Sequence, residues 1–443
     1  MKKNVFRRLL IALLVLALPA MHAGALASEL DFPFFDKRST EETAPAESSE
    51  SSTDFGFGFN LPMGAAERIP PEKVKKITSA DAARIDMSMQ QYEPQEETLI
   101  INRATTYYYY EQLGPVAKEI YDIMLMIAKD PATEGNWGVM MTDMNPESEE
   151  YYYEMLCAYF ALTYDHPELF WLYQGIETSI NFCSEMMSMN GLYLVYFGLT
   201  EPYTKYEAQM TAFNTAADAF LADINTNTSD YEIVKQIHDK LIDLVTYDQN
   251  VLKNMYAEGN NLAHTAYGAL VANTQGISNY AVCDGYSLAF EYLLQQCGIE
   301  AVVVAGDAGS DPLSAGGHAW NLVKLNNNWY EVDSTWNDAG TIEAEIVPGI
   351  EYYEEFRTAI TDPDYREKLQ HAMFLISTQE LRNFNPGDEY RYYLPDGSGS
   401  LSLIGSSVHI RWSYEGMPDP YNADPAVISL APVATANYQP FVY

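Results

Sequence analysis

A cysteine, a histidine and an aspartate follow one another along this chain in the order that a thiol-dependent acyl-transfer site requires. They are Cys283 in Val-Cys-Asp-Gly-Tyr, His318 in Gly-Gly-His-Ala-Trp-Asn and Asp333 in Tyr-Glu-Val-Asp-Ser-Thr-Trp. A cysteine nucleophile needs a base that removes its proton and a third group that orients this base. The three residues therefore predict acyl transfer through a thioester. In it Cys283 attacks an amide carbonyl, His318 acts as base and then as acid, and Asp333 orients the imidazole.

A purely structural role is the alternative for Cys283, because a cysteine in an apolar helix is more often a small core residue than a nucleophile. A disulfide to Cys297 does not explain it, since on one continuous helix the two would lie about 21 Å apart, far beyond the ~7 Å limit for a disulfide. Cys157 and Cys183 could pair or could be two buried thiols. The sequence has no Cys-x-x-Cys, no His-Glu-x-x-His and no glycine-rich phosphate loop, so neither a metal nor a cofactor is predicted.

The segment after Cys283 has apolar residues at near-helical spacing, and Gly298 follows as a stop. Cys283 is therefore predicted in the first turn of a buried helix, where unpaired N–H groups and the helix dipole favour a thiolate. The backbone N–H of Cys283 is the expected donor to the oxyanion of the tetrahedral intermediate. Candidate second donors or substrate contacts are Gln275, Trp320 and Tyr286.

The histidine and the aspartate lie on two predicted strands that are joined by a tight turn at Asn326-Asn327. If this turn has two residues, His318 lies opposite Thr335. Asp333 then lies diagonal to His318 on the same face of the hairpin and within side-chain reach. The hairpin is thus predicted to present the base and its orienting group side by side.

The stretch from about Ser229 to Asp338 resembles the transglutaminase-like superfamily of papain-type cysteine acyltransferases and peptidases, and within it the secreted bacterial branch. Motifs similar to those of that branch stand at 282–286, 318–321 and 330–338. The resemblance implies an α+β fold, with a papain/transglutaminase-like catalytic core behind an N-terminal helical domain. It also implies the roles of nucleophile, base and orienting group for Cys283, His318 and Asp333.

Three functions are compatible with this resemblance, because the superfamily includes amide cross-linkers, peptidases, deglycosylating enzymes and inactive scaffolds. The first is secreted thiol-dependent acyl transfer on protein or peptide amides. The second is a secreted cysteine peptidase that acts on envelope or environmental peptides. The third is a non-catalytic module that binds through the aromatic helical domain, and the intact triad argues against it. Transfer and hydrolysis differ only in the nucleophile that reaches the thioester, so the sequence does not separate the first two. It does not indicate an oligomeric state either.

The N-terminus predicts export. Four basic residues precede an apolar stretch from Leu9 to Leu18, and small residues follow up to Ala27, which is the pattern of a secretory signal peptide cleaved near Ala27. The stretch is too short for a membrane span, and no later one is longer, so no membrane insertion is expected. The formal net charge of −37 repels nucleic acid and anionic lipid. The expected partner is a protein or peptide substrate.

Composition and pattern divide the chain into five parts. Residues 1–27 form the signal peptide, and the Ser-, Glu-, Thr- and Pro-rich residues 28–92 a disordered linker. Residues 93–227 are predicted as a helical, tyrosine-rich domain. Residues 228–412 form the catalytic domain, which begins at a capping box of Ser229 and Glu232 and ends in three further strands expected to complete its sheet. Residues 413–443 are an irregular tail. His238 and His264 are interpreted as core or helix-cap residues rather than ligands.

Overall fold

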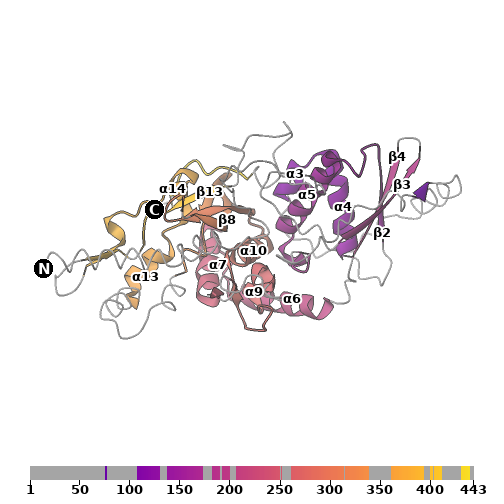
Figure 1. The fold of residues 1–443 in the computed structure, drawn as a ribbon. Coiled ribbons are helices and arrows are strands. Elements are labelled where there is room, and N and C mark those ends of the chain that lie inside the picture. The colour runs from indigo at the N-terminus through magenta and orange to yellow at the C-terminus, as the bar shows by residue number, and fades with distance from the viewer. Residues whose placement is uncertain are drawn as a thin grey trace, which may run out of the picture.

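A computed structural model describes residues 75–76, 107–129, 137–172, 182–189, 192–199, 206–249, 251, 261–313, 315–338, 361–393, 400–402, 404–411 and 431–439. The protein is a mixed helix and sheet structure, as predicted, with two separate larger sheets (Figure 1). The predicted signal peptide lies outside the described residues. So does the predicted linker, apart from the short strand β1 (Lys75–Lys76). Among the described helices, none combines the length and the apolar character needed to cross a bilayer.

The first region is built on three helices, α3 (Tyr108–Gln112), α4 (Pro115–Lys129) and α5 (Glu149–Asp165), followed by the turn η2 (Pro167–Leu169). Helix α4 buries one apolar face, whose members recur at helical spacing: Ala117, Ile120, Tyr121, Met124, Ile127 and Ala128. Asp165 at the end of α5 caps α3, because its carboxylate accepts the N–H groups of Tyr109 and Tyr110 at 3.1 and 2.9 Å. Aromatic residues thus serve packing here.

The prediction of a helical domain at residues 93–227 is wrong in one respect, because three strands from these residues form a four-stranded sheet with β1, in the order β1-β3-β4-β2. Strands β2 (Trp137–Thr142), β3 (Phe182–Met189) and β4 (Leu192–Leu199) pair antiparallel, while β1 runs parallel to β3. Met189 pairs with Leu192 across Asn190-Gly191, a dipeptide that favours tight hairpins. Short runs rich in methionine and aromatic residues fit a helix or a strand equally well, and this ambiguity misled the prediction.

The second region begins with helices α6 (Glu207–Leu221) and α7 (Asp230–Leu244). Ser229 caps α7 as predicted, since its side chain accepts the N–H of Glu232 at 3.3 Å. Short elements then lead to the central helix: β5 (Thr246–Tyr247), η5 (Asn261–His264), α9 (Ala266–Leu270) and β6 (Tyr280–Ala281). The central helix α10 (Cys283–Gln296) is buried from Gly285 to Gln295, and Gly298, with a φ of 78°, follows its end as predicted.

A five-stranded antiparallel sheet packs against α10, in the order β10-β9-β8-β7-β13. Its strands are β7 (Ala301–Gly309), β8 (Gly316–Leu325), β9 (Asn328–Val332), β10 (Phe374–Ile376) and β13 (Val408–Arg411). The turn at Asn326-Asn327 has two residues, both with positive φ, as predicted. The ladder between β8 and β9 ends at the Asn321–Val332 pair, so the predicted pairing of His318 with Thr335 is not formed.

The C-terminal part adds α13 (Pro363–Gln370), α14 (Thr378–Arg382), η6 (Asp388–Tyr390) and a separate pair of strands, β11 (Arg391–Tyr393) and β12 (Ser400–Ser402). Of the strands expected to complete the catalytic sheet, β10 and β13 do so, whereas β11 and β12 do not. In the predicted tail, residues 431–439 have no regular secondary structure. They are nevertheless attached to the domain, because Ala434 accepts the N–H of Thr378 and Tyr438 donates to Leu375.

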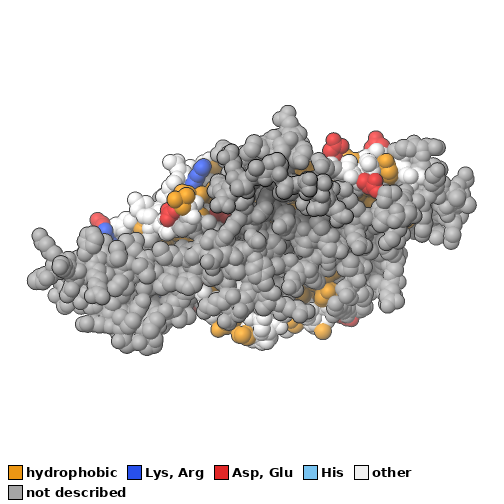
Figure 2. Space-filling view, in the orientation of Figure 1, with side chains coloured by type: hydrophobic (Ala, Val, Ile, Leu, Met, Phe, Trp, Pro, Cys, Tyr) orange, Lys and Arg blue, Asp and Glu red, His pale blue; other side chains and the backbone are white. Residues whose placement is uncertain are grey.

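One hydrophobic core runs through both regions. Phe170 of the first region packs on Tyr267 of the second, with ring centroids 4.6 Å apart, and within the second region Phe213 of α6 packs on Tyr292 at 4.9 Å. The Tyr109 hydroxyl also donates to the carbonyl of Val303 in β7. The first region therefore covers part of the second one's apolar surface. Figure 2 shows acidic side chains on the visible face at the end of the molecule that holds α4 and β4.

Candidate active site

Cys283 is the first residue of α10 and is half-buried. Val282 before it is extended, and its carbonyl accepts the N–H of Tyr286, which closes the first helical turn. Gly285 lets this turn approach η5, because a Cβ at position 285 would lie only 2.4 Å from the carbonyl oxygen of Ala263. The Cys-Asp-Gly motif therefore places the thiol at a helix N-terminus, where N–H groups and the dipole favour negative charge.

His318 and Asp333 meet as predicted, although the contact lies beyond the end of the β8–β9 ladder, whose last pair is Asn321–Val332. The His318 Nε2 is 2.7 Å from Asp333 Oδ2, and both side chains are buried. The other carboxylate oxygen of Asp333 accepts the N–H of Trp336 at 2.9 Å, and the Asp333 N–H donates to the carbonyl of Met373. Hydrogen bonds therefore fix both the carboxylate of Asp333 and its backbone.

The structure also brings Cys283 close to this pair, near enough for its thiol group to contribute to the pKa of His318. Burial alone would favour the neutral imidazole. The charge and hydrogen bond of Asp333, joined by Cys283, outweigh burial and raise the pKa of His318 to about 10. Burial likewise opposes ionisation of Asp333, but His318 and then His409 hold its pKa well below the usual range. At neutral pH a charged imidazole therefore lies beside the carboxylate of Asp333 and close to Cys283.

His409 on β13 was not singled out from the sequence. Its Nε2 is 2.9 Å from Asp333 Oδ2, the same oxygen that His318 contacts. In sequence it is an isolated histidine in a strand-like stretch, 76 residues from Asp333, and no local pattern joins the two. The nitrogen and oxygen atoms of His318, Asp333 and His409 lie within 4.8 Å of one another, close enough for a metal ion. The Nε2 atoms of both histidines instead form hydrogen bonds with Oδ2 of Asp333, so the three residues form a hydrogen-bonded cluster.

The predicted substrate contacts need correction. Tyr286 is fully buried, and its hydroxyl donates to Asp338 at 2.8 Å, because the third residue after Cys283 on α10 points into the core. Trp320 is 1% exposed and its indole N–H donates to Glu331 at 2.9 Å, so this N–H is not available to an oxyanion. Gln275 is exposed in the turn closed by the Ala272–Ser278 bridge, and its role stays a prediction.

His264 contacts Asp284, the residue that follows the predicted nucleophile Cys283. The His264 Nδ1 is 2.8 Å from Oδ2 of Asp284, the residue that follows Cys283. Burial opposes the charged form of His264, but Asp284 outweighs it and raises the pKa of this histidine. The pair anchors η5 to the start of α10, so His264 is a packing residue that holds the helix N-terminus, in line with its interpretation from sequence.

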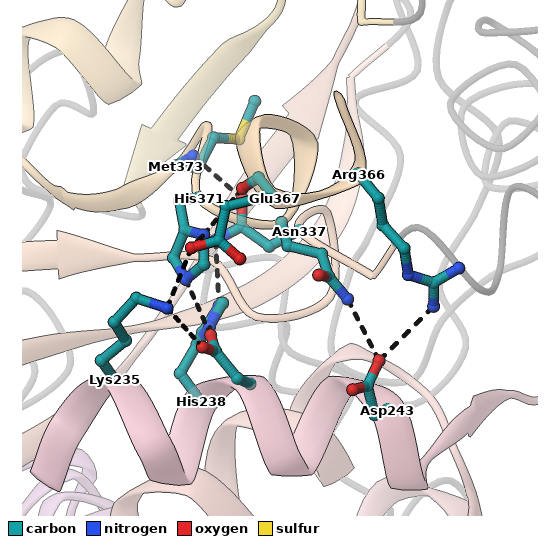
Figure 3. Close-up of polar contacts among 10 residues, drawn as sticks. Lys235, His238, Asp243, Asn337, Arg366, Glu367, His371 and Met373 are labelled. Carbon is teal, nitrogen blue, oxygen red and sulfur yellow. Dashed lines mark hydrogen bonds and ion pairs between the residues drawn. The ribbon is translucent and has the colours of Figure 1, made fainter. Parts of the chain in front are cut away.

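A second cluster lies between α7 and the segment that begins with α13 (Figure 3). Asp239 accepts from Lys235 at 2.7 Å, from Nδ1 of His238 at 2.9 Å and from Nε2 of His371 at 2.7 Å. These hydrogen bonds outweigh burial and hold the pKa of Asp239 well below its usual range. The other nitrogen of His371 lies 2.7 Å from the carbonyl oxygen of Glu367. Both nitrogens of His371 thus lie within hydrogen-bond distance of oxygen atoms.

The cluster has three ligand atoms within 4.8 Å of one another, but its donor set does not fit a metal ion. Asn337 Oδ1 accepts the N–H of Met373 at 2.9 Å, so the Asn337 amide nitrogen donates to Nε2 of His238 at 3.1 Å. The proton of His238 is therefore on Nδ1, where a metal would have to bind. Lys235 already places a positive charge on the carboxylate of Asp239, at 2.7 Å. His238 is thus a satisfied core histidine, as expected.

Comparisons with known proteins concern the second region of the chain. Residues 218–334 match the family model described as the Transglutaminase-like superfamily, so the chain contains a transglutaminase-like domain. Kyphoscoliosis peptidase of Mus musculus is 30% identical over 113 residues, which are 23% of this chain and 17% of that protein. The Homo sapiens protein is 29% identical over the same shares. The chain thus spans only 17% of the length of these curated relatives.

One solved structure, described as "Crystal structure of a TGase", is 18% identical to this chain. The match covers 34% of this chain and 44% of that one, with a TM-score of 0.23. This score is too low to support a detailed superposition.

Proposed function

We propose that this transglutaminase-like domain catalyses thiol-dependent acyl transfer on protein or peptide amides, with Cys283, His318 and Asp333 as nucleophile, base and orienting group. One observation carries the proposal: the Nε2 of His318 lies 2.7 Å from the buried carboxylate of Asp333, and Cys283 is close enough to contribute to the raised pKa of this imidazole. A cysteine that served only to fill the core would not need a charged imidazole held against it.

The steps follow from the positions of the protons. The Cys283 thiolate attacks the carbonyl carbon of a carboxamide or peptide bond, and the N–H at the start of α10 stabilises the oxyanion. The protonated His318 then gives its proton to the nitrogen of the departing ammonia or amine, and a thioester remains on Cys283. An incoming amine or water gives a proton to His318 and attacks the thioester. Collapse of this second intermediate releases the acyl product and restores the thiolate beside the imidazolium.

A cysteine peptidase is the second candidate, and the similarity to kyphoscoliosis peptidase favours it. The two activities share every step up to the thioester. They differ in whether water or an amine reaches that thioester, and in whether the leaving group is ammonia or a peptide amine. A non-catalytic binding module is the third candidate, supported by the aromatic first region alone.

Incubation of the purified protein with casein and a fluorescent primary amine tests the proposal and separates the candidates. Incorporation of the label supports acyl transfer, casein fragments support proteolysis, and neither product supports the binding module. Cys283→Ala should abolish either activity. Cys297→Ala is the matched control, because this thiol lies at the other end of the same helix, and it should retain activity. Loss of activity in both variants with the fold intact would contradict the assignment of Cys283.

We further propose that the protein is exported and belongs to the secreted bacterial branch of the superfamily. The basic and apolar pattern of residues 2–27 supports this, together with the small residues that precede Ser28. The test is expression in a bacterial host with a Sec pathway, followed by N-terminal mass spectrometry of the protein in the medium. A mature N-terminus at or near Ser28 is expected. Retention of the full-length chain inside the cell would contradict export.

A further inference from the structure

The geometry points to His409 as a positioning residue of the reaction, a second imidazole that holds the orienting carboxylate of Asp333 in place for His318. This inference rests on the proposed function. His409 comes from β13, the edge strand of the five-stranded sheet, where it pairs with Ala308 of β7. Ala308 in turn pairs with Gly316 of β8. Since alternate residues of a strand share a face, His409 and His318 project from the same face of the sheet.

The hydrogen bonds define what His409 contributes. Oδ2 of Asp333 receives Nε2–H groups from both His318, at 2.7 Å, and His409, at 2.9 Å, while Oδ1 receives the N–H of Trp336. Three donors therefore hold the carboxylate plane at both of its oxygens. Loss of the His409 donor would leave Oδ2 held only by His318, the group that the carboxylate is meant to orient.

His409 is the neutral member of the two histidines. Burial lowers its pKa, and the favourable contact with Asp333 does not reverse this effect. Its Nε2 must carry the proton that Asp333 accepts, so Nδ1 is an unprotonated acceptor. This Nδ1 is buried and has no hydrogen-bond partner among the described residues. A proton relay from His409 to solvent would need such a partner, so His409 orients Asp333 rather than transferring protons.

The surrounding rings keep His409 in this position. The rings of Trp336 and Trp320 meet it edge-on, with centroids 4.8 and 5.2 Å away, and His318 lies at 5.6 Å. Space for the indole of Trp320 depends on Gly306, because a Cβ there would lie 2.6 Å from this ring. Packing against these rings restricts the orientation of the His409 imidazole, and a residue that positions another group needs such a fixed orientation.

The test compares variants that separate the hydrogen bond of His409 from its volume. His409→Phe keeps a flat ring but removes the donor, and His409→Gln keeps an N–H at a similar reach. The readout is the rate of Cys283 alkylation by iodoacetamide at pH 6 relative to pH 9, which reports how well His318 is held against the thiol. In His409→Phe this ratio should fall about tenfold, the value of one charge-assisted hydrogen bond. His409→Gln should recover most of it. The kcat for amine incorporation should fall in parallel in His409→Phe, with little change in KM.

Val408→Ala on the same strand is the control for a structural role, because it removes packing without touching Asp333. It should lower the melting temperature while leaving the alkylation ratio unchanged. If His409→Phe does not fold, the comparison of His409→Gln with His409→Met decides, since methionine fills volume without a donor. Ratios equal to wild type in both donor-less variants would overturn the inference. A wild-type Cys283 that reacts no faster than Cys297 would instead overturn the proposed function itself.

Discussion

Replacement of Asp333 by asparagine tests the electrostatic core of the site. The pKa of His318 rises from 6.5 to about 10 through Asp333 and Cys283. Since one pKa unit corresponds to about 1.4 kcal/mol, the imidazolium is stabilised by a net amount on the order of 5 kcal/mol, after the opposing cost of burial. Asparagine keeps an oxygen acceptor but removes the charge, while burial still disfavours the imidazolium. The pKa of His318 should then fall to its ordinary value or below, leaving roughly a tenth of the imidazole charged at pH 7.5.

The assay is alkylation of Cys283 by iodoacetamide, followed site by site with mass spectrometry. At pH 7.5 the rate in Asp333→Asn should fall by roughly tenfold or more, and it should recover toward pH 9, where an ordinary thiol ionises. Cys297 is the internal control, and its rate should not change. Turnover should fall further than alkylation, because orientation of the base is also damaged. An alkylation rate at pH 7.5 equal to that of wild type would refute the role assigned to Asp333.

Three further results are expected. Because folding raises the pKa of His318 from 6.5 to about 10, its contribution to the free energy of unfolding is complete below pH 6.5 and disappears as the pH rises to about 10. Urea unfolding should therefore show stability falling across that window in wild type, and falling less in His318→Gln. Gly285→Ala should cost about 1–3 kcal/mol, since its Cβ meets the Ala263 carbonyl. Gly405→Ala, whose Cβ would lie in open space, should cost little. A fragment that starts at Thr228 should bind a hydrophobic dye and aggregate, because it exposes rings that the first region covers; a soluble and fully active fragment would contradict this.

The parts of the site that local sequence could predict are those fixed by short-range patterns. Apolar spacing and Gly298 located the helix that Cys283 begins, and two asparagines with positive φ closed the hairpin between His318 and Asp333. Each of these features depends on neighbours within one helical turn or one tight turn. Ser229 could be predicted as the cap of α7 for the same reason, because its partner Glu232 is only three residues away.

The features that escaped prediction depend on contacts between distant segments. His409 reaches Asp333 only because β13 is added to the edge of the sheet. The donor role considered for Trp320 failed because Glu331, on the neighbouring strand, accepts its N–H. Strands β2 to β4 were missed because methionine- and tyrosine-rich runs satisfy both helical and strand burial, and pairing between distant segments decides between them.

Asn337 gives the surface of the protein a direct connection to the catalytic carboxylate. Its amide joins Met373, whose carbonyl holds the Asp333 backbone, to His238 and through it to Asp239. Side chains on α7 and α13 that look like ordinary surface charges are therefore attached to the active site by a short series of hydrogen bonds. For protein engineering, this means that charge changes or immobilisation through Lys235 carry a cost in activity. The side chain of Leu313, which is 99% exposed, is the safer place for a label.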